Sequence, residues 1–115
     1  MLDDFLETES KLVDQLTILK KDFELCAVKA EFEAEGASLR DLFKLRVLTA
    51  RYDVPLYLKI GGVEALRDIK DAMELGVDGL IAPMVESPFG VMKFVGAVKS
   101  VFGKRKLFKS INIET

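Results

Sequence analysis

The chain of 115 residues contains no histidine and only one cysteine, Cys26. Without histidine, an acid–base step must use carboxylates, lysines, tyrosines or a metal-bound water, and a metal site must be rich in oxygen ligands. One cysteine excludes an intrachain disulfide, and because no segment resembles a signal peptide, we expect a cytoplasmic protein. Cys26 begins an expected strand and has no histidine partner, so we interpret it as a core thiol rather than a nucleophile.

Long apolar runs and an excess of one charge are also missing. Charged residues interrupt every hydrophobic stretch before the ~20 residues that a membrane-spanning helix requires, so we expect no membrane partner. The 17 basic and 19 acidic side chains are intermixed and give a formal net charge of −2. This balance argues against a nucleic-acid partner, because such binding needs a concentrated basic face.

Hydrophobic periodicity divides the chain into alternating helices and strands. Residues 1–24 are predicted to form an N-terminal amphipathic helix. Four strands are expected beyond it, over 25–33, 56–60, 79–83 and 107–113. Helix ends are marked by local signals: Ser38 and Ser87 stand at N-cap positions, and Gly76 stands where a C-terminal glycine belongs.

One helix in each gap between strands gives three successive βαβ units, which is an α/β fold. Parallel strands need crossovers of this kind, and such crossovers are almost always right-handed, so we predict a parallel sheet covered by helices. Two architectures accept the pattern. One is a small open doubly wound sheet of flavodoxin-like size, and the other is about half of a TIM (β/α)8 barrel.

Functional residues of parallel α/β proteins lie at the carboxyl ends of the strands. At each of the four expected ends the chain has charged residues or glycine. The candidate site residues are Lys29, Glu31, Glu33, Lys59, Gly61, Pro83, Met84, Glu86, Asn112 and Glu114. A buried charge is costly unless it is paired or coordinates a metal, so convergence of these side chains would indicate one of those two roles.

Two further features have plainer interpretations. The pair Gly61-Gly62 precedes a predicted helix, where backbone amides can cradle a phosphate, but two glycines alone more often form a turn. The charged helix residues Arg67-Asp68 are expected to face solvent.

Motifs at the strand ends carry a resemblance to a known family. The segments are Lys29–Gly36 (KAEFEAEG), Leu58–Gly62 (LKIGG), Ile81–Gly90 (IAPMVESPFG) and Ile111–Thr115 (INIET). They resemble the HpcH/HpaI aldolase and citrate lyase beta-subunit family, which belongs to the phosphoenolpyruvate/pyruvate-binding TIM-barrel superfamily. The resemblance implies that residues 25–115 form a partial TIM-barrel domain, truncated at its C-terminal end, behind an N-terminal helix.

Members of this family bind a divalent cation, usually magnesium, which holds a 2-oxo acid and stabilises its enolate while a carbon–carbon bond is broken or formed. The resemblance therefore implies a lyase or aldolase that uses Mg²⁺, or another divalent cation such as Mn²⁺. The substrate would be a small-molecule 2-oxo acid or acyl compound. Glu114 stands at the position of one metal ligand, and the second, an aspartate on the following strand, lies beyond Thr115. Gly61, Pro83, Met84 and Glu86 would line the substrate pocket.

The chain departs from the family's aldolases at two positions. Those enzymes have an arginine where this chain has Lys59, and a lysine cannot form the fixed fork of a guanidinium group. They also use a histidine near an early strand, where this chain offers Glu31 and Glu33. We expect Lys59 to contact substrate and Glu31 or Glu33 to orient the substrate or act as the base.

The alternative is a non-catalytic α/β interaction or assembly module. A receiver domain is disfavoured within that class, because its phospho-acceptor aspartate belongs where this chain has Ala82-Pro83. Half a barrel would leave open sheet edges and an uncovered apolar interior, which predicts a homo-oligomer. We expect the isolated chain to have little or no activity, because half of the metal shell and the other barrel loops would be missing.

Overall fold

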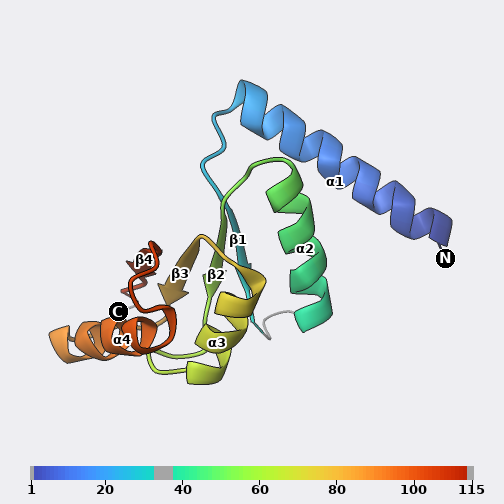
Figure 1. Ribbon diagram of the computed structural model, residues 1–115. Helices are drawn as coiled ribbons and strands as arrows, with labels where there is room; N and C mark the ends of the chain where they lie inside the picture. The colour runs from blue at the N-terminus through green and yellow to red at the C-terminus, as the bar shows by residue number, and fades with distance from the viewer. Residues whose placement is uncertain (1, 33–37, 114–115) are drawn as a thin grey trace.

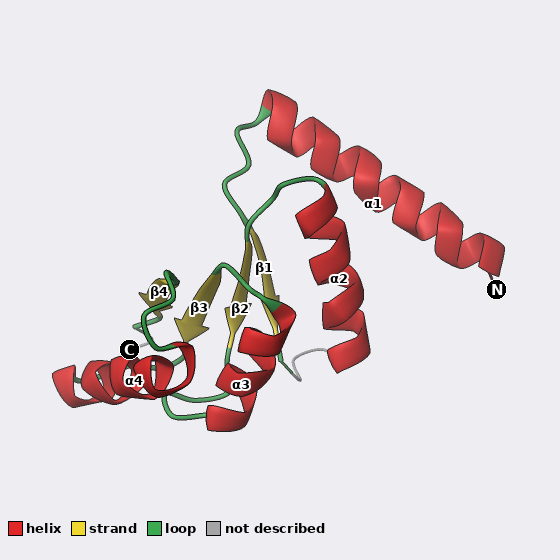
Figure 2. Cartoon of the chain, in the orientation of Figure 1, coloured by secondary structure: helices red, strands yellow, loops and turns green. Residues whose placement is uncertain are grey.

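A computed structural model describes residues 2–32 and 38–113 of the chain. Helices and strands alternate along it as predicted (Figures 1 and 2). The elements are α1 (Leu2–Asp22), β1 (Val28–Glu31), α2 (Leu39–Arg51), β2 (Leu56–Lys59), α3 (Leu66–Leu75), β3 (Gly79–Ala82), α4 (Pro88–Phe102) and β4 (Phe108–Ile111). The α/β fold class is therefore confirmed.

The four strands form one parallel sheet in the order β1-β2-β3-β4. A flavodoxin-like doubly wound sheet has β1 inside the sheet and reverses direction there, whereas this sheet adds each new strand on the same side. Figure 2 shows α2, α3 and α4 together on one side of the sheet. The described part of the chain is therefore singly wound, and of the two predicted architectures it departs from the doubly wound one.

The core lies between the sheet and these three helices. Alternate residues of β2, Leu56 and Leu58, are fully buried and belong to one cluster with Ile69 of α3 and Phe94 of α4. Because side chains alternate across a strand, the residues between them point to the opposite face, which α2, α3 and α4 leave uncovered. The fold therefore separates an apolar helix-covered face from a second face of different composition.

Local capping signals set the helix ends. Ser38 accepts a hydrogen bond from the Asp41 backbone N–H, and Asp41 accepts one from the Ser38 N–H, which makes a reciprocal capping box at the start of α2. Ser87 caps α4 with Pro88 in its first turn. Gly76 ends α3 with φ 67°, a left-handed conformation that glycine adopts without a Cβ clash. These three predictions are confirmed.

Helix α1 projects away from the sheet (Figure 1). Its buried apolar contact is Leu16, which is 5% exposed, and near its end the Lys20 Nζ donates to the carbonyl oxygens of Tyr52 and Asp53 at 2.8 and 3.2 Å. Among the described residues, no helix has both the length and the apolar character needed to cross a bilayer.

The prediction that Cys26 lies in the core is wrong. The strand begins at Val28 rather than at 25, and Cys26 lies exposed in the connection between α1 and β1. The backbone of Glu24, with φ 54°, turns the chain at this point, so the residues just before the strand stay outside the core.

Candidate functional site

A row of side chains crosses the carboxyl ends of the strands on the uncovered face. Glu31 is the direct register partner of Lys59, Lys59 of Ile81, and Ile81 of Ser110. Register partners on adjacent parallel strands lie about 4.8 Å apart and point to the same face. The structure thus brings together two of the predicted residues, Glu31 and Lys59, both half-buried.

A second row lies on the same face toward the amino ends of the strands. The register places Lys29, Tyr57, Gly79 and Phe108 side by side. The rings of Tyr57 and Phe108 stack across the glycine, with centroids 4.8 Å apart and planes 11° from parallel. This face therefore has an aromatic layer beside the layer that contains Glu31 and Lys59.

The loop after β2 is tied to helix α3. The Gly61 N–H donates to the Asp68 carboxylate at 2.8 Å, so this amide is not directed at a bound anion, and the plainer interpretation of Gly61-Gly62 as a turn is favoured. Asp68, which was expected to face solvent, is half-buried, and its carboxylate accepts this bond. Asp68 thereby fixes the chain two residues beyond Lys59.

The segment after β3 places its predicted residues differently. Pro83 is half-buried, whereas Met84 is 66% exposed with φ 46°. Val85 turns back into the core and is 2% exposed. Glu86 borders an apolar hollow of about 580 Å³ formed with the start of α4 and with Ile111.

That hollow lies on the helix-covered side, because Ile111 packs against the main core cluster. Glu31 and Lys59 lie on the opposite face. The structure therefore separates Glu86 from Glu31 and Lys59, although Glu86 follows β3 and the other two residues end β1 and β2.

The fourth strand brings Asn112 to the same edge. Its N–H donates to the Ala82 carbonyl, and its own carbonyl accepts from the Val85 N–H, both at 2.9 Å. Glu33 and Glu114 lie outside the described residues. Within 2–32 and 38–113, no three His, Cys, Asp or Glu side chains gather closely enough to hold a metal ion.

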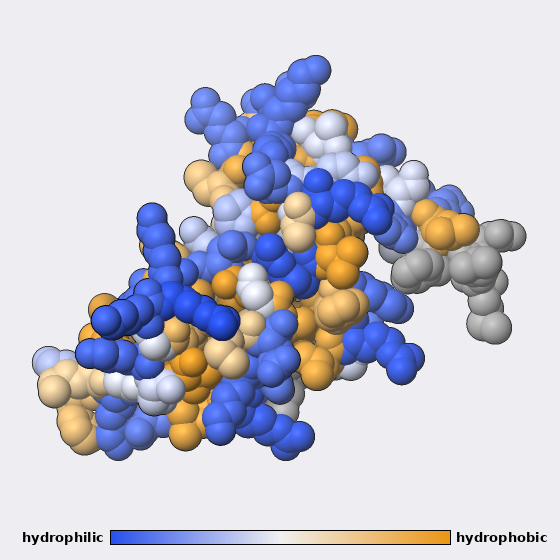
Figure 3. All heavy atoms as spheres, in the orientation of Figure 1, coloured by the Kyte–Doolittle hydropathy of each residue, from blue (hydrophilic) through white to orange (hydrophobic). Residues whose placement is uncertain are grey.

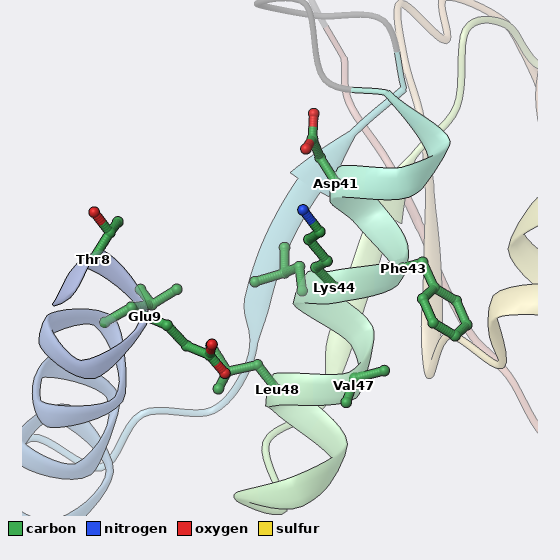
Figure 4. Close-up of a pocket in the computed structure, with 9 residues that line it drawn as sticks. Thr8, Glu9, Asp41, Phe43, Lys44, Val47 and Leu48 are labelled. Carbon is green, nitrogen blue, oxygen red and sulfur yellow. The ribbon is translucent and has the colours of Figure 1, made fainter. Parts of the chain in front are cut away.

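A separate hollow of about 420 Å³ lies between α1 and α2 (Figure 4). None of the predicted site residues lines it. Its wall is largely apolar, and Figure 4 shows Glu9 and Leu48 pointing toward one another while Phe43 points away from α1. Asp41 lies on its rim, where hydrogen bonds from the Ser38 backbone and hydroxyl lower the pKa of the carboxyl group. No motif in the sequence predicted this hollow, because its walls come from two separate helices.

Sequence reasoning also missed Tyr57, Phe108 and Ser110 as residues of the uncovered face. The alternation in β4, where Phe108 and Ser110 share a face with the predicted Asn112, was the signal that could have found two of them. Comparison of the chain with family models, with curated proteins and with solved structures gives no match.

Proposed function

We propose that this chain belongs to a carbon–carbon lyase or aldolase that binds a 2-oxo acid at the carboxyl edge of the sheet. In this proposal, residues 25–115 supply about half of a (β/α)8 barrel. The observation that carries it is the direct adjacency of Glu31 and Lys59 at strand ends on the uncovered face. Support also comes from the sequence, because each of the four segments that resemble the family begins in or at the end of a strand of this sheet, within the part of the chain that the structure describes.

The two side chains have complementary roles. The Lys59 ammonium group would attract the substrate carboxylate as a point charge. Glu31 would accept the proton of the substrate hydroxyl group, after which the carbon–carbon bond breaks and its electron pair forms the enolate of the 2-oxo acid. A divalent cation held by Glu114 would supply Lewis-acid stabilisation of that enolate.

The experiment is calorimetric titration of the chain with oxalate, a mimic of the enolate, in the presence of Mg²⁺. We expect Lys59→Met to weaken binding about tenfold or more, since it removes the positive charge proposed to attract the carboxylates of the ligand. Glu31→Gln should not weaken the binding of oxalate, which has no hydroxyl proton for Glu31 to accept and which a carboxylate repels. Glu114→Gln should remove the dependence on Mg²⁺.

Lys29→Met is the matched control, because Lys29 lies on the same face and the same strand as Glu31 but in the aromatic row. It should leave oxalate binding unchanged. Equal loss in Lys29→Met and Lys59→Met, or no binding by the wild-type chain, would contradict the proposal.

A non-catalytic assembly module is the second candidate. It is favoured by large exposed apolar side chains on three helices: Leu6, Ile18 and Leu19 of α1, Phe43 and Val47 of α2, and Phe89 and Met92 of α4. Figure 3 shows apolar residues reaching the surface over α2. Such a module would associate with itself or a partner and would bind no oxalate.

A further inference from the structure

The chain exposes more surface than a compact monomer of its size. Its accessible surface is 7996 Å², about 1,700 Å² above the value expected for 12.8 kDa. Its radius of gyration is 15.2 Å, against about 13 Å for a compact domain of this length. Each partner of a standard protein–protein interface buries about 800 Å². The surplus is therefore large enough for an extensive interface.

Both edges of the sheet are open in the described part of the chain. The outer strands β1 and β4 each pair with a single neighbour. On β4, the N–H groups of Phe108 and Asn112 donate to the carbonyl oxygens of Asp78 and Ala82, on the β3 side. Because hydrogen-bonding directions alternate along a strand, the backbone groups of Lys109 and Ile111 point away from β3, toward the open edge. An open edge of this kind is a template for another strand.

Apolar side chains are exposed at both ends of this singly wound arrangement. At the β4 end they are Met92, Val95, Phe108 and Ile113, and at the α1–α2 end they are Leu12, Leu19, Phe43 and Val47. Every copy of the chain carries both of these apolar surfaces, one beside β4 and one beside α1 and α2. They therefore suit a contact in which the β4 side of one copy meets the β1 side of another better than a contact between two identical sides.

Charged side chains also lie beside the two outer strands. Residues 1–24 contain seven acidic and three basic side chains, two of the basic ones, Lys20 and Lys21, in the last turn of α1, whereas 99–109 contain five basic and no acidic ones. Asp22 and Glu24 lie before β1, and Lys104 and Lys106 lie before β4, all exposed. In a parallel β4–β1 pairing the segments that precede the two strands come to the same edge of the sheet, so these charges would meet.

We propose that a second copy of this chain covers the open edges and the uncovered face. In the resulting dimer, β4 of each copy pairs in parallel with β1 of the other, around a two-fold axis that runs along the strands. Such an axis preserves strand direction, so both new contacts are parallel and no edge stays open. Eight strands enclose an interior that side chains can fill, here the aromatic row and the row of Glu31 and Lys59 from both copies. The inference concerns assembly and does not rest on the proposed reaction.

Sedimentation equilibrium of the 115-residue chain over a concentration series tests this. We expect a closed dimer of twice 12.8 kDa. The reversals Lys104→Glu with Lys106→Glu, and Asp22→Lys with Glu24→Lys, should each weaken the dimer about tenfold or more, while all four together should restore it, because attraction between the same groups returns. The exposed pair on the central helix provides the control: Lys70→Glu with Glu74→Lys should leave the dimer unchanged.

A monomer at every concentration overturns the proposal, and a mass that keeps growing with concentration overturns the closed dimer in favour of an open chain of copies. If the variant that carries all four charge reversals does not regain the dimer, the residues before β4 of one copy do not meet those before β1 of the other. Since the mutated side chains are exposed, circular dichroism should show an unchanged fold in every variant.

Cross-linking provides a second, independent test. Cys26 is exposed and precedes β1 by two residues, and Lys106 precedes β4 by two. In Lys106→Cys, a short bismaleimide should join Cys26 of one copy to the introduced thiol of the other. Wild-type chain should cross-link much less, because the two Cys26 side chains would lie on opposite sides of the barrel. Lys70→Cys is the control, and equal yields from it and from Lys106→Cys would contradict the pairing.

Discussion

The ring of Tyr57 stacks on the ring of Phe108 across a strand that contributes no side chain between them. Gly79 occupies the position between the two, and a Cβ placed there would lie 2.7 Å from Cδ1 of Tyr57 and 3.2 Å from Cβ of Phe108. The stacking therefore requires glycine at this register position for steric reasons, although its φ is not in the left-handed region. The pair links β2 to β4 through a contact that the backbone ladder does not make.

Gly79→Ala tests this relationship. The added methyl group must displace the Tyr57 ring, and overpacking of this kind typically costs about 1–3 kcal/mol of unfolding free energy. Gly96→Ala is the matched control: Gly96 lies inside α4, and a Cβ placed there would meet nothing within 4 Å, so alanine should raise stability by about 0.5–1 kcal/mol. Chemical denaturation of the two variants checks the opposite signs, and similar effects would contradict the steric argument.

The elements were predictable from sequence because their signals are local. Ser38 with Asp41, and Ser87 with Pro88, mark the starts of two helices within four residues. The stacking of Tyr57 on Phe108 depends instead on the register between strands that are not neighbours in sequence. The same is true of the open face, which follows from the strand order and from the placement of α2, α3 and α4 on one side.

Asp78 joins three elements near the amino ends of the strands. Its Oδ2 accepts from Arg46 Nη1 of α2 at 2.8 Å and from the Leu56 N–H of β2 at 2.9 Å. Leu56 is fully buried, so Asp78→Ala would leave its N–H without this acceptor and should cost about 1–3 kcal/mol. Asp78→Asn should cost less, because the amide oxygen can still accept.

The exposed pair Glu7–Lys11 provides the contrast for Asp78. Its side chains are 65% and 72% exposed, and exposed pairs contribute about 0–1 kcal/mol. Glu7→Ala should therefore change the denaturation midpoint little. A loss from Glu7→Ala as large as that from Asp78→Ala would refute the assignment of the effect to the buried N–H.

Asp68 should control the mobility of the loop beside Lys59. The N-cap residue of α3, Ala65, has no side chain that could cap the helix. Asp68, in the first turn of α3, instead accepts a hydrogen bond from the Gly61 N–H in the preceding loop. A hydrogen bond to a charged group contributes about 1.5–3 kcal/mol, so Asp68→Ala should speed hydrogen exchange at Gly61 by about tenfold or more. Asp71→Ala on the same helix is the control, and it should leave exchange at Gly61 unchanged.

The candidate site was only partly predictable. The alternation of Lys29 and Glu31 predicted that they share a face, and Lys59 lies at the end of its strand as expected. The adjacency of Glu31 and Lys59 is a consequence of register, and the separation of Glu86 follows from the turn at Met84, whose φ is 46°. Neither the adjacency of Glu31 and Lys59 nor the separation of Glu86 can be predicted from a short segment, since each depends on how elements distant in sequence are placed.

The capping box of α2 predicts a specific dependence of stability on pH. Hydrogen bonds from the Ser38 N–H and hydroxyl, at 3.1 and 3.0 Å, lower the pKa of Asp41 below its ordinary value of 3.8, with smaller contributions from Lys44 and Arg40. A carboxyl group whose pKa is lower in the folded state stabilises the fold fully above its unfolded pKa. That contribution is then lost as the pH falls through the lower folded value.

Asp41→Asn should therefore be less stable than wild type at neutral pH, and the difference should narrow as the pH falls below about 3.8. An NMR titration of the Asp41 carboxyl carbon measures the same effect directly, and Ser38→Ala should move its pKa back toward 3.8 because the hydroxyl donor is gone. Asp14→Asn, on the exposed side of α1, is the control for loss of one negative charge. If Asp14→Asn and Asp41→Asn show the same pH dependence, the change comes from net charge rather than from the cap.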